Sequence, residues 1–471
     1  MKVDTIIVGA GTAGLSALRE VRNYTEDFLL VNAGHWGTTC AAVGCMPSKA
    51  LIEAANAFHR RHAMEEFGIC GGGGLRADLP AVLAHVRRLR DDFVKGPESM
   101  PEKLGTRAIQ GRAEVTGPGR VAVNGREIEA RAIILAPGSH PVVPGPWKAF
   151  GERILTTDTL FEQEDLPARM AVVGMGAIGA EMAQALARLG VEVAGFDAAE
   201  SLAGIDDAEV SARFRDLLGR EVALYLGAQA ELEEAGGGAI RVSGAGGSFE
   251  ADAVLAAMGR QPNVGGLGLE SLGVPLDDGG LPEIDPETLR IGETGVFLAG
   301  DANGRRPLLH EAADDGHIAG RMAAPDAGGS GLCRRKALSI TFCAPQVARV
   351  GPPLSEMGEW DIATGATDFA DQGRARLAGE AEGLLRIHAD RTTGRILGAE
   401  ICAPAGEHMA HLLALAIEQD MTVARMLAMP FYHPVIEEGL RSALRALAKE
   451  LPEAGGSDLS DCRDIGLDAL D

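Results

Sequence analysis

The sequence predicts an α/β fold with two Rossmann-like dinucleotide-binding domains and a C-terminal α+β domain. A strand, glycine turn and helix open the chain at TIIVGAGTAGLSALREV, and the same plan recurs from Met170 at MAVVGMGAIGAEMAQALARLG. From Lys336 onward the glycine fingerprint is gone, and short strands alternate with amphipathic helices. These observations predict two nucleotide-binding domains followed by a third domain of a different kind.

Turn-rich segments predict where these domains begin and end. RAIILAPGSHPVVPG is typical of a strand that ends in a Pro/Gly-rich turn, and GVFLAGDANGRRPLLHEA begins a new strand, turn and helix after the second domain. We therefore expect a discontinuous first domain, a second domain inserted into it, a third domain and a short acidic tail. Their expected ranges are 1–150 with 277–335, 151–276, 336–450 and 451–471. The sequence assigns the tail no role.

The first glycine fingerprint consists of Gly9, Gly11 and Gly14 between a strand and a helix. Such a turn lets the backbone approach a pyrophosphate at the positive end of the helix. An acidic residue usually ends the following strand and binds a ribose hydroxyl, but here LLVNAG places Asn32 there. An amide can still hydrogen-bond a hydroxyl, although it carries no charge.

The second fingerprint, Gly174, Gly176 and Gly179, is followed by Asp197 at the end of VEVAGFD. A carboxylate at this position accepts hydrogen bonds from the free 2′-hydroxyl of NAD and repels the 2′-phosphate of NADP. The two alanines that come next supply no arginine for that phosphate. The sequence therefore predicts a preference for NAD(H) over NADP(H).

Composition excludes several classes of partner. Lys and Arg number 44 against 67 Asp and Glu, and the net charge of −23 disfavours nucleic acid and anionic membranes. No apolar run approaches the roughly 18 residues of a membrane span. The N-terminal segment resembles neither a signal peptide nor a transit peptide, so we expect a cytoplasmic protein. The seven cysteines are too scattered for a secreted disulfide framework.

Cys40 and Cys45 form the one close cysteine pair, in GTTCAAVGCMPSKALIEAANAFH. A loop of this size can close a disulfide ring, and a helix N-terminus with nearby Lys49 would favour the thiolate. Buried packing and a metal site are the alternatives for two nearby cysteines. A metal site would want further Cys or His at compact spacing, and none follows, so we expect no metal.

GTTCAAVGCMPSK resembles the redox signature of the class I pyridine nucleotide-disulfide oxidoreductases. The likeness extends over about residues 1–450 and rests on several further segments. These are APGSHPVVPG, AAMGRQPNVGGLGLE, FLAGDANGRRPLLHEA, TFCAPQVARVG and FYHPVIEEG. The resemblance implies an enzyme with FAD in the first domain, NAD in the second, and a third domain that mediates dimerisation.

The resemblance also implies a role for each matching residue. Cys40 would exchange with the substrate sulfur, Cys45 would face the flavin, and Lys49 would lie by the reactive flavin edge, paired with Glu181. Other cofactor contacts would come from Ala113, Gly138, Asp301 and Leu309 toward FAD, and from Gly259 toward NAD.

His433 and Glu438, in HPVIEE, would form an acid/base pair. Taken alone, a single histidine is more often structural than catalytic, and the chain has 11 of them. The resemblance implies that this histidine reaches the cysteines of a partner subunit, so that a homodimer would be required. A general base near an attacking thiol is also a chemical need of the reaction.

The expected reaction is a transfer of electrons from a dithiol, through the two cysteines and FAD, to NAD⁺. The branch of the family most similar to this chain is the dihydrolipoyl dehydrogenases, which implies protein-bound dihydrolipoamide as substrate. Asn32, Gln346 and the tail depart from the usual pattern. The alternatives are an NAD(P)H-dependent reductase of another disulfide or of a metal ion, and a flavin-binding subunit without turnover.

Overall fold

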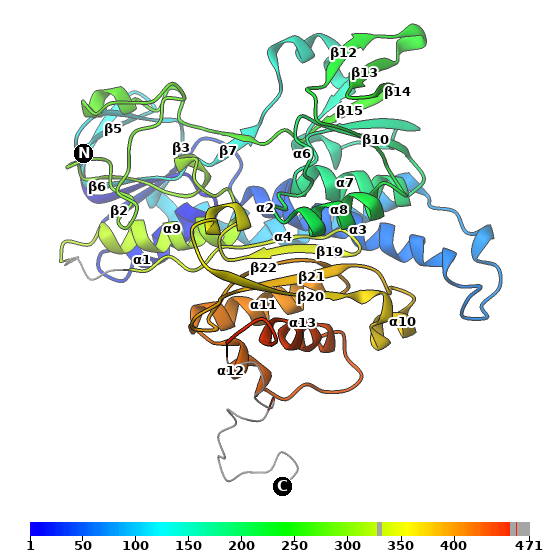
Figure 1. Cartoon of the computed structure of the whole chain (residues 1–471). Coiled ribbons are helices and arrows are strands. Elements are labelled where there is room, and N and C mark those ends of the chain that lie inside the picture. Colours follow the sequence, from blue (N-terminus) through cyan, green and yellow to red (C-terminus); the bar gives the residue numbers. More distant parts are fainter. Residues whose placement is uncertain (327–331, 453–457, 459–471) are drawn as a thin grey trace.

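The computed structural model describes residues 1–326, 332–452 and 458. Two α/β domains lie side by side, and a third domain lies beneath them (Figure 1). The predicted α/β fold, with two Rossmann-like domains and a C-terminal α+β domain, is confirmed. The tail assigned to 451–471 falls outside the described residues, apart from 451, 452 and 458.

A seven-stranded sheet forms the first domain, in the order β3-β2-β1-β6-β5-β4 with β17 beside β6. β1, β2, β3, β6 and β17 run parallel, so the loops that follow β1 and β17 open at one edge. The strands are β1 (Lys2–Val8), β2 (Phe28–Asn32), β3 (Ala108–Gln110), β4 (Ala113–Gly117), β5 (Arg120–Val123), β6 (Arg126–Leu135) and β17 (Val296–Leu298). The pairing of β17 with β6 returns the chain to its first sheet, and the domain boundaries themselves stay predictions.

Helices cover this sheet and lead from it to the cysteines. α1 packs against α9, which begins just after β17. Gly316 and Gly320 allow that contact, since a Cβ atom at Gly316 would lie 2.2 Å from the carbonyl oxygen of Ala13. The helices are α1 (Thr12–Val21), α2 (Thr39–Ala42), α3 (Cys45–His59), α4 (Leu79–Glu98), α5 (Met100–Leu104) and α9 (Leu309–Met322).

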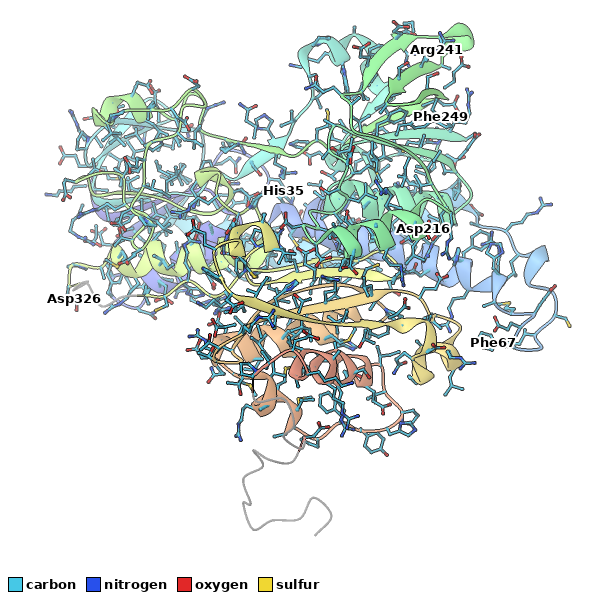
Figure 2. All side chains as sticks on the ribbon, viewed as in Figure 1. His35, Phe67, Asp216, Arg241, Phe249 and Asp326 are labelled. Carbon is cyan, nitrogen blue, oxygen red and sulfur yellow. The ribbon has the colours of Figure 1, made fainter. Side chains whose placement is uncertain are left out.

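The second domain is built on a five-stranded parallel sheet in the order β11-β10-β9-β15-β8. Its strands are β8 (Ile154–Leu155), β9 (Arg169–Val173), β10 (Glu192–Asp197), β11 (Ala223–Leu226) and β15 (Ala253–Ala256). Its helices are α6 (Thr157–Leu160), α7 (Ala177–Arg188) and α8 (Ala208–Leu218). An antiparallel sheet of β12 (Glu231–Glu234), β13 (Ile240–Gly244) and β14 (Gly247–Ala251) lies above it, where Figure 2 labels Arg241 and Phe249. β7 (Ser139–Pro141) and β16 (Arg260–Pro262) pair where the chain passes between the two domains.

The third domain is an antiparallel sheet in the order β18-β19-β22-β21-β20, with helices on one face. Its strands are β18 (Leu338–Thr341), β19 (Gln346–Val350), β20 (Ile362–Asp368), β21 (Leu384–Asp390) and β22 (Ile396–Ala403). Its helices are α10 (Gly373–Ala378), α11 (Gly406–Glu418), α12 (Val423–Leu427) and α13 (Glu438–Ala448).

Alternating residues give this sheet two apolar faces. Val347 and Cys402 pack into the core that contains α3 and α7, whereas the neighbouring Ala348 and Ile401 pack against α11, α12 and α13. The sheet therefore separates the C-terminal helices from the redox helix within one chain (Figure 1).

Short 3-10 helices connect many of these elements. Their bounds are Arg60–His62, Gly72–Gly74, Gly105–Arg107, Gly145–Arg153, Gly236–Gly238, Leu269–Leu272, Gly300–Asn303, Leu354–Met357 and Phe369–Asp371. The connection from α3 to α4 extends far enough for Phe67 to touch the third domain, because a Cβ atom at Gly379 would lie 3.3 Å from the Phe67 ring. Figure 2 labels Phe67 at the edge of the molecule, near α10.

Candidate functional site

One cavity brings together predicted residues from distant parts of the chain. It is lined by the loop after β1, the start of α3, the segment that follows β6, the first turns of α7 and the residues after β17. The predicted residues that line it are Gly11, Cys40, Cys45, Lys49, Gly138, Glu181, Asp301 and Leu309. The cysteine pair, the first glycine turn and the second domain thus meet at one place.

The two cysteines lie on consecutive helices. Cys40 is in α2, whose first turn is capped by the Thr38 hydroxyl, which accepts a hydrogen bond from the Ala41 amide. Cys45 is the first residue of α3, where the positive end of the helix dipole stabilises an anion. Both are free thiols; Cys45 is exposed and Cys40 is half-buried. Their positions allow thiol–disulfide chemistry at the mouth of the cavity.

The two cysteine thiols differ in pKa. A hydrogen bond from the Cys40 thiol, together with the Lys49 cation, lowers the pKa of Cys45 to about 7, although partial desolvation of the sulfur atom opposes the shift in a residue that is exposed as a whole. The same hydrogen bond to Cys45 raises the pKa of Cys40 well above its usual range. Cys45 is therefore the sulfur of the reduced pair that ionises around neutral pH, and Cys40 keeps its proton.

Lys49 is held by Glu181, across the boundary between two domains. Its Nζ atom donates to both carboxylate oxygens, at 3.0 and 2.9 Å, and Glu181 is 4% exposed. The Phe342 amide donates to Glu181 at 2.8 Å, and the Phe342 ring lies 4.6 Å from Nζ. Three domains thus fix the ammonium group at the wall of the cavity.

A second polar cluster lies on the first-domain side of the cavity. The Ser139 hydroxyl donates to Asp301 Oδ2 at 2.7 Å, and Arg260 donates to the Ser139 hydroxyl and carbonyl, at 2.8 Å each. Sequence reasoning missed Ser139 and Arg260, although both fall inside the quoted segments APGSH and GRQPN. Asp301 keeps one oxygen atom free of these bonds, as a contact to a flexible polyhydroxyl chain requires.

The first fingerprint is shaped by close backbone contacts. Gly9 has φ +105°, and a Cβ atom there would lie 2.0 Å from the Ala136 carbonyl oxygen; at Gly14 it would lie 1.9 Å from the Gly9 oxygen. A Cβ atom at Gly11 would meet nothing within 4 Å, which leaves the space that a pyrophosphate needs. Asn32 accepts a hydrogen bond from the Ala10 amide at 3.2 Å. This cradle fits the pyrophosphate of FAD.

The second fingerprint repeats this geometry. Gly174 has φ +92°, Gly179 packs against the Gly174 carbonyl, and a Cβ atom at Gly176 would meet nothing within 4 Å. Asp197 accepts hydrogen bonds from the Met175 amide at 2.5 Å and the Ala199 amide at 2.8 Å. The carboxylate therefore braces the glycine turn at the strand end where a ribose is bound in such folds.

Some predicted cofactor residues lie outside the cavity. Ala113 is 5% exposed in β4 and belongs to the first-domain core. Gly259 follows β15 with φ +94°, and its carbonyl accepts a hydrogen bond from the Val142 amide. Gly9, Gly14, Asn32 and the second-fingerprint residues do not line it either. Their proposed cofactor contacts stay predictions.

His433 and Glu438 form a close pair in the third domain. The Nδ1 atom of His433 lies 3.0 Å from both carboxylate oxygens of Glu438. The hydrogen bond from His433 lowers the pKa of Glu438. The imidazole is 79% exposed and does not line the cysteine cavity of its own chain. The neighbouring Phe431 and Ile436 pack against the core of α11, α12 and α13, on the opposite face of the third sheet from α3, so the imidazole is oriented and accessible on that side.

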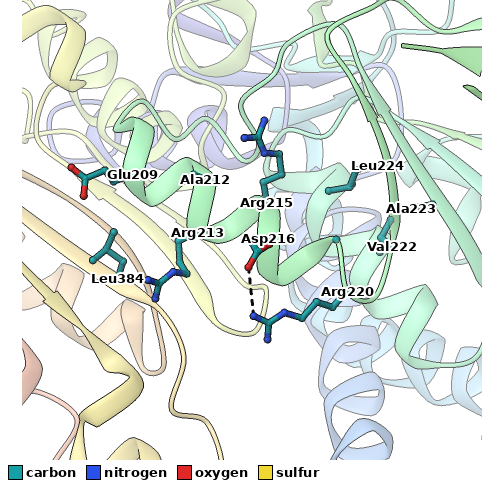
Figure 3. Close-up of a pocket in the computed structure, with 11 residues that line it drawn as sticks. Glu209, Ala212, Arg213, Arg215, Asp216, Arg220, Val222, Ala223, Leu224 and Leu384 are labelled. Carbon is teal, nitrogen blue, oxygen red and sulfur yellow. Dashed lines mark ion pairs between the residues drawn. The ribbon is translucent and has the colours of Figure 1, made fainter. Parts of the chain in front are cut away.

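A wider groove lies elsewhere, between α8 and the third domain, and Figure 3 shows its side chains. It is lined by Arg213, Arg215, Asp216 and Arg220, and none of the predicted site residues lies in it. Arg213 pairs with Asp368 at 2.7 Å, while Arg220 lies 3.6 Å from Asp216. The groove therefore carries no part of the chemistry described above.

Within 1–326, 332–452 and 458, no group of three or more His, Cys, Asp or Glu is placed to hold a metal ion. No helix in these ranges is long and apolar enough to cross a membrane.

Comparison with known protein families shows to which family the chain belongs. Residues 3–316 match the family model described as pyridine nucleotide-disulphide oxidoreductase, and residues 338–444 match the dimerisation domain of the same family. The chain belongs to this family. Membership confirms the predicted family, its oxidoreductase class and its cofactors, FAD and NAD(H). A matched dimerisation domain also supports a homodimer.

Relatives from several organisms resemble nearly the whole chain. The dihydrolipoyl dehydrogenase of Thermus scotoductus is 32% identical, over 95% of this chain and 98% of the relative. That of Chlamydia pneumoniae is 30% identical, over 92% and 95%. The structure of LpdA from Mycobacterium tuberculosis superposes with a TM-score of 0.82 at 27% identity, covering 94% of this chain and 99% of LpdA. The flavoprotein disulfide reductase RclA from Escherichia coli shares the fold, with a TM-score of 0.81 at 21% identity, over 94% and 99%.

Proposed function

We propose that this family member is a cytoplasmic, homodimeric dihydrolipoyl dehydrogenase, which oxidises protein-bound dihydrolipoamide with NAD⁺. The cavity carries the proposal, because it places a sulfur pair, a fixed ammonium group and the first glycine turn together. The relatives that align over nearly the whole chain support the choice of dithiol. The carboxylate of Asp197 supports NAD⁺ as the acceptor.

The reaction at the cysteines is a thiol–disulfide exchange. With Cys40 and Cys45 joined as a disulfide, one substrate thiolate attacks Cys40 Sγ, and the Cys40–Cys45 bond breaks with Cys45 leaving as thiolate. The second substrate sulfur then attacks the mixed disulfide, closes the substrate disulfide and releases Cys40. Two cysteine sulfurs are reduced, two substrate sulfurs are oxidised, and the low pKa of Cys45 makes it the better leaving group.

His433 accounts for the protons of this exchange. A substrate thiol must lose its proton before it attacks, and an imidazole held by Glu438 can accept it. Because His433 is exposed and lies apart from the cysteines of its own chain, the histidine of a second copy would supply this group. The enzyme would then be active only as a dimer.

The residues of the cavity fit FAD, which when bound supplies the oxidation of the two cysteine thiols and the transfer of the electron pair to NAD⁺. Gly9, Gly11 and Gly14 would hold its pyrophosphate, and Asp301, braced by Ser139, would hold the polyhydroxyl chain. Lys49 would lie at the reactive edge, because its ammonium group is fixed at the cavity wall by Glu181.

The decisive assay follows NAD⁺ reduction by dihydrolipoamide with the purified holoenzyme. We expect turnover in the wild type and a loss of more than about 1000-fold in Cys40→Ser, Cys45→Ser and His433→Gln, because each removes a reacting group. Cys70→Ser is the matched control, since Cys70 is exposed and does not line the cavity. It should retain wild-type turnover.

Other outcomes would redirect the assignment. No turnover, together with bound FAD and a reducible cysteine pair, would indicate a reductase of another disulfide or of a metal ion. Failure to reduce the pair with NADH or with any dithiol would indicate a flavin-binding subunit. Full dithiol turnover in the two cysteine variants would contradict the mechanism.

A further inference from the structure

The helix α7 carries a buried polar stripe, of which the reaction described above uses only Glu181, through its contact with Lys49. Glu181, Gln184 and Arg188 are 4%, 4% and 9% exposed. Their spacing of three and four residues places them on one face of the helix. Burial of such groups is costly unless every one of them is paired, so the contacts of the stripe should be specific.

Arg188, at the far end of the stripe, is fully engaged. It donates to Glu221 through Nε at 2.7 Å and Nη2 at 2.8 Å, to Asn56 Oδ1 at 2.6 Å and to the Ala344 carbonyl at 3.1 Å. Asn56 belongs to α3, the helix that begins at Cys45. The guanidinium therefore joins α7 to the redox helix and to the loop between β18 and β19.

Gln184 strengthens the same junction. Its amide accepts a hydrogen bond from the Ala344 N–H at 2.8 Å and donates to the Ala344 carbonyl at 2.9 Å and to Glu221 at 2.9 Å. The loop is thus held by its backbone, at Ala344 here and at Phe342 by Glu181.

Two side-chain contacts, equally spaced along both helices, join α3 to α7. Lys49 pairs with Glu181, and Asn56 pairs with Arg188. In each helix the tied residues are seven positions apart, about 10 Å along the axis. α3 and α7 therefore run parallel and in register, and both lie above β19 in Figure 1.

From this geometry we propose that Arg188, acting through Asn56, is a positioning residue that fixes the register of α3 against α7 and so places Lys49 beside Cys45. The proposal rests on the proposed function only in that Cys45 is taken as a reacting sulfur. Cys45 and Lys49 share the first turn of α3, so a slide or rotation of the helix moves both groups relative to Glu181.

The charge at Cys45 provides a readout for this role. The titratable and charged groups that act on its sulfur are Cys40, Lys49 and Glu181; Lys49 lowers its pKa and Glu181 raises it. Loosening the distant tie lets Lys49 leave its position and exposes Cys45 to the unpaired Glu181. The pKa of Cys45 should then rise, and the thiolate fraction at neutral pH should fall.

The test measures alkylation of Cys45 by iodoacetamide against pH in the reduced holoenzyme, followed for the Cys45 peptide by mass spectrometry. We expect a wild-type midpoint near the pKa of about 7. In Arg188→Met and Asn56→Ala it should move up by about one pH unit, which is about fivefold less thiolate at pH 7. The double variant should show no further shift, because both changes break one tie. Arg188→Lys should recover part of it.

Arg386→Met is the matched control. Arg386 is another inter-domain arginine; it lies 2.7 Å from Asp207, in the loop before α8, and takes no part in the two ties between α3 and α7. It should lower thermal stability and leave the Cys45 midpoint unchanged. Unchanged midpoints in Arg188→Met and Asn56→Ala, or an equal shift in the control, would overturn the proposal. If Arg188→Met fails to fold, Asn56→Ala decides, since it leaves no buried charge unpaired. The measurement needs neither dihydrolipoamide nor NAD⁺, so it fails independently of the proposed substrate.

Discussion

The two glycine fingerprints have the same backbone conformation but differ in the side chain that stabilises it. In both, the first glycine has positive φ and packs against the carbonyl of a neighbouring strand end, and the middle glycine borders open space. Asp197 braces the second turn through two accepted backbone hydrogen bonds. Asn32 accepts one in the first turn, and its amide group donates to the carbonyls of Gly34 and His35.

This difference indicates that one backbone motif serves two purposes. An amide can bind the loop that follows it, because it both donates and accepts, and such a loop suits a cofactor that stays bound. A carboxylate only accepts, and its charge remains available to select among nucleotides that come and go. We therefore infer that Asn32 is a structural brace of the first fingerprint, and that Asp197 both braces the second fingerprint and selects the nucleotide.

The largest expected effect distinguishes the two glycine fingerprints by the cofactor that each would bind. Gly9→Ala forces a Cβ atom to 2.0 Å from a carbonyl oxygen at a positive φ, which costs about 3 kcal/mol or more. We expect purified protein without FAD. Gly174→Ala should keep FAD and lose NAD⁺-dependent turnover. Flavin absorbance after purification measures the FAD content, and NADH kinetics measure the turnover. Loss of FAD in Gly174→Ala would show that the two fingerprints do not act separately.

The next effect tests the selective role of the carboxylate. Asp197→Asn gives the second fingerprint the same amide side chain that Asn32 supplies in the first. It also removes the charge that would repel a 2′-phosphate. We expect the ratio of kcat/KM for NADH over NADPH to fall by about 10- to 100-fold, with FAD content unchanged. Steady-state kinetics with both nucleotides measure the ratio. An unchanged ratio, or a wild type that prefers NADPH, would contradict the predicted NAD(H) preference.

A smaller effect concerns Lys49, which joins the first two domains. The first domain carries Cys45 and Lys49, and the second domain carries Glu181, which holds Lys49. The hydrogen bond from Cys40 is the main cause that lowers the pKa of Cys45 to about 7, and the Lys49 cation adds to it, so Lys49→Met should raise this pKa and reduce the thiolate at neutral pH by up to about tenfold. The pH dependence of Cys45 alkylation measures this. Lys103→Met, an exposed control, should leave it unchanged.

The smallest effect tests the structural brace. Asn32→Asp keeps the acceptor for Ala10 and loses both donors, which leaves a carboxylate facing the Gly34 and His35 carbonyls. We expect a loss of about 1 kcal/mol in stability, with FAD still bound and the nucleotide preference unchanged. Thermal release of flavin fluorescence measures it. A gain in FAD affinity would show instead that the missing charge matters at the ribose.

Much of the architecture could be predicted from local patterns. Glycines at fixed spacing between an apolar strand and a helix have few other uses, so both Rossmann-like domains were recognisable. Ser139 and Arg260 were missed, even though they lie in quoted segments, because a serine and an arginine in a loop have no spacing that signals a partner 162 or 121 residues away. Arg188 was missed for a similar reason, since a helix pattern does not tell which polar face will be buried.

The sequence by itself determined the family, the two nucleotide turns and the cysteine pair, since these depend on residues close together in the chain. Only the tertiary structure decided that α7 ties the redox helix to the third domain, and that His433 lies across a sheet from the cysteines of its own chain. Such facts depend on how distant helices and sheets pack, where burial makes each polar contact specific.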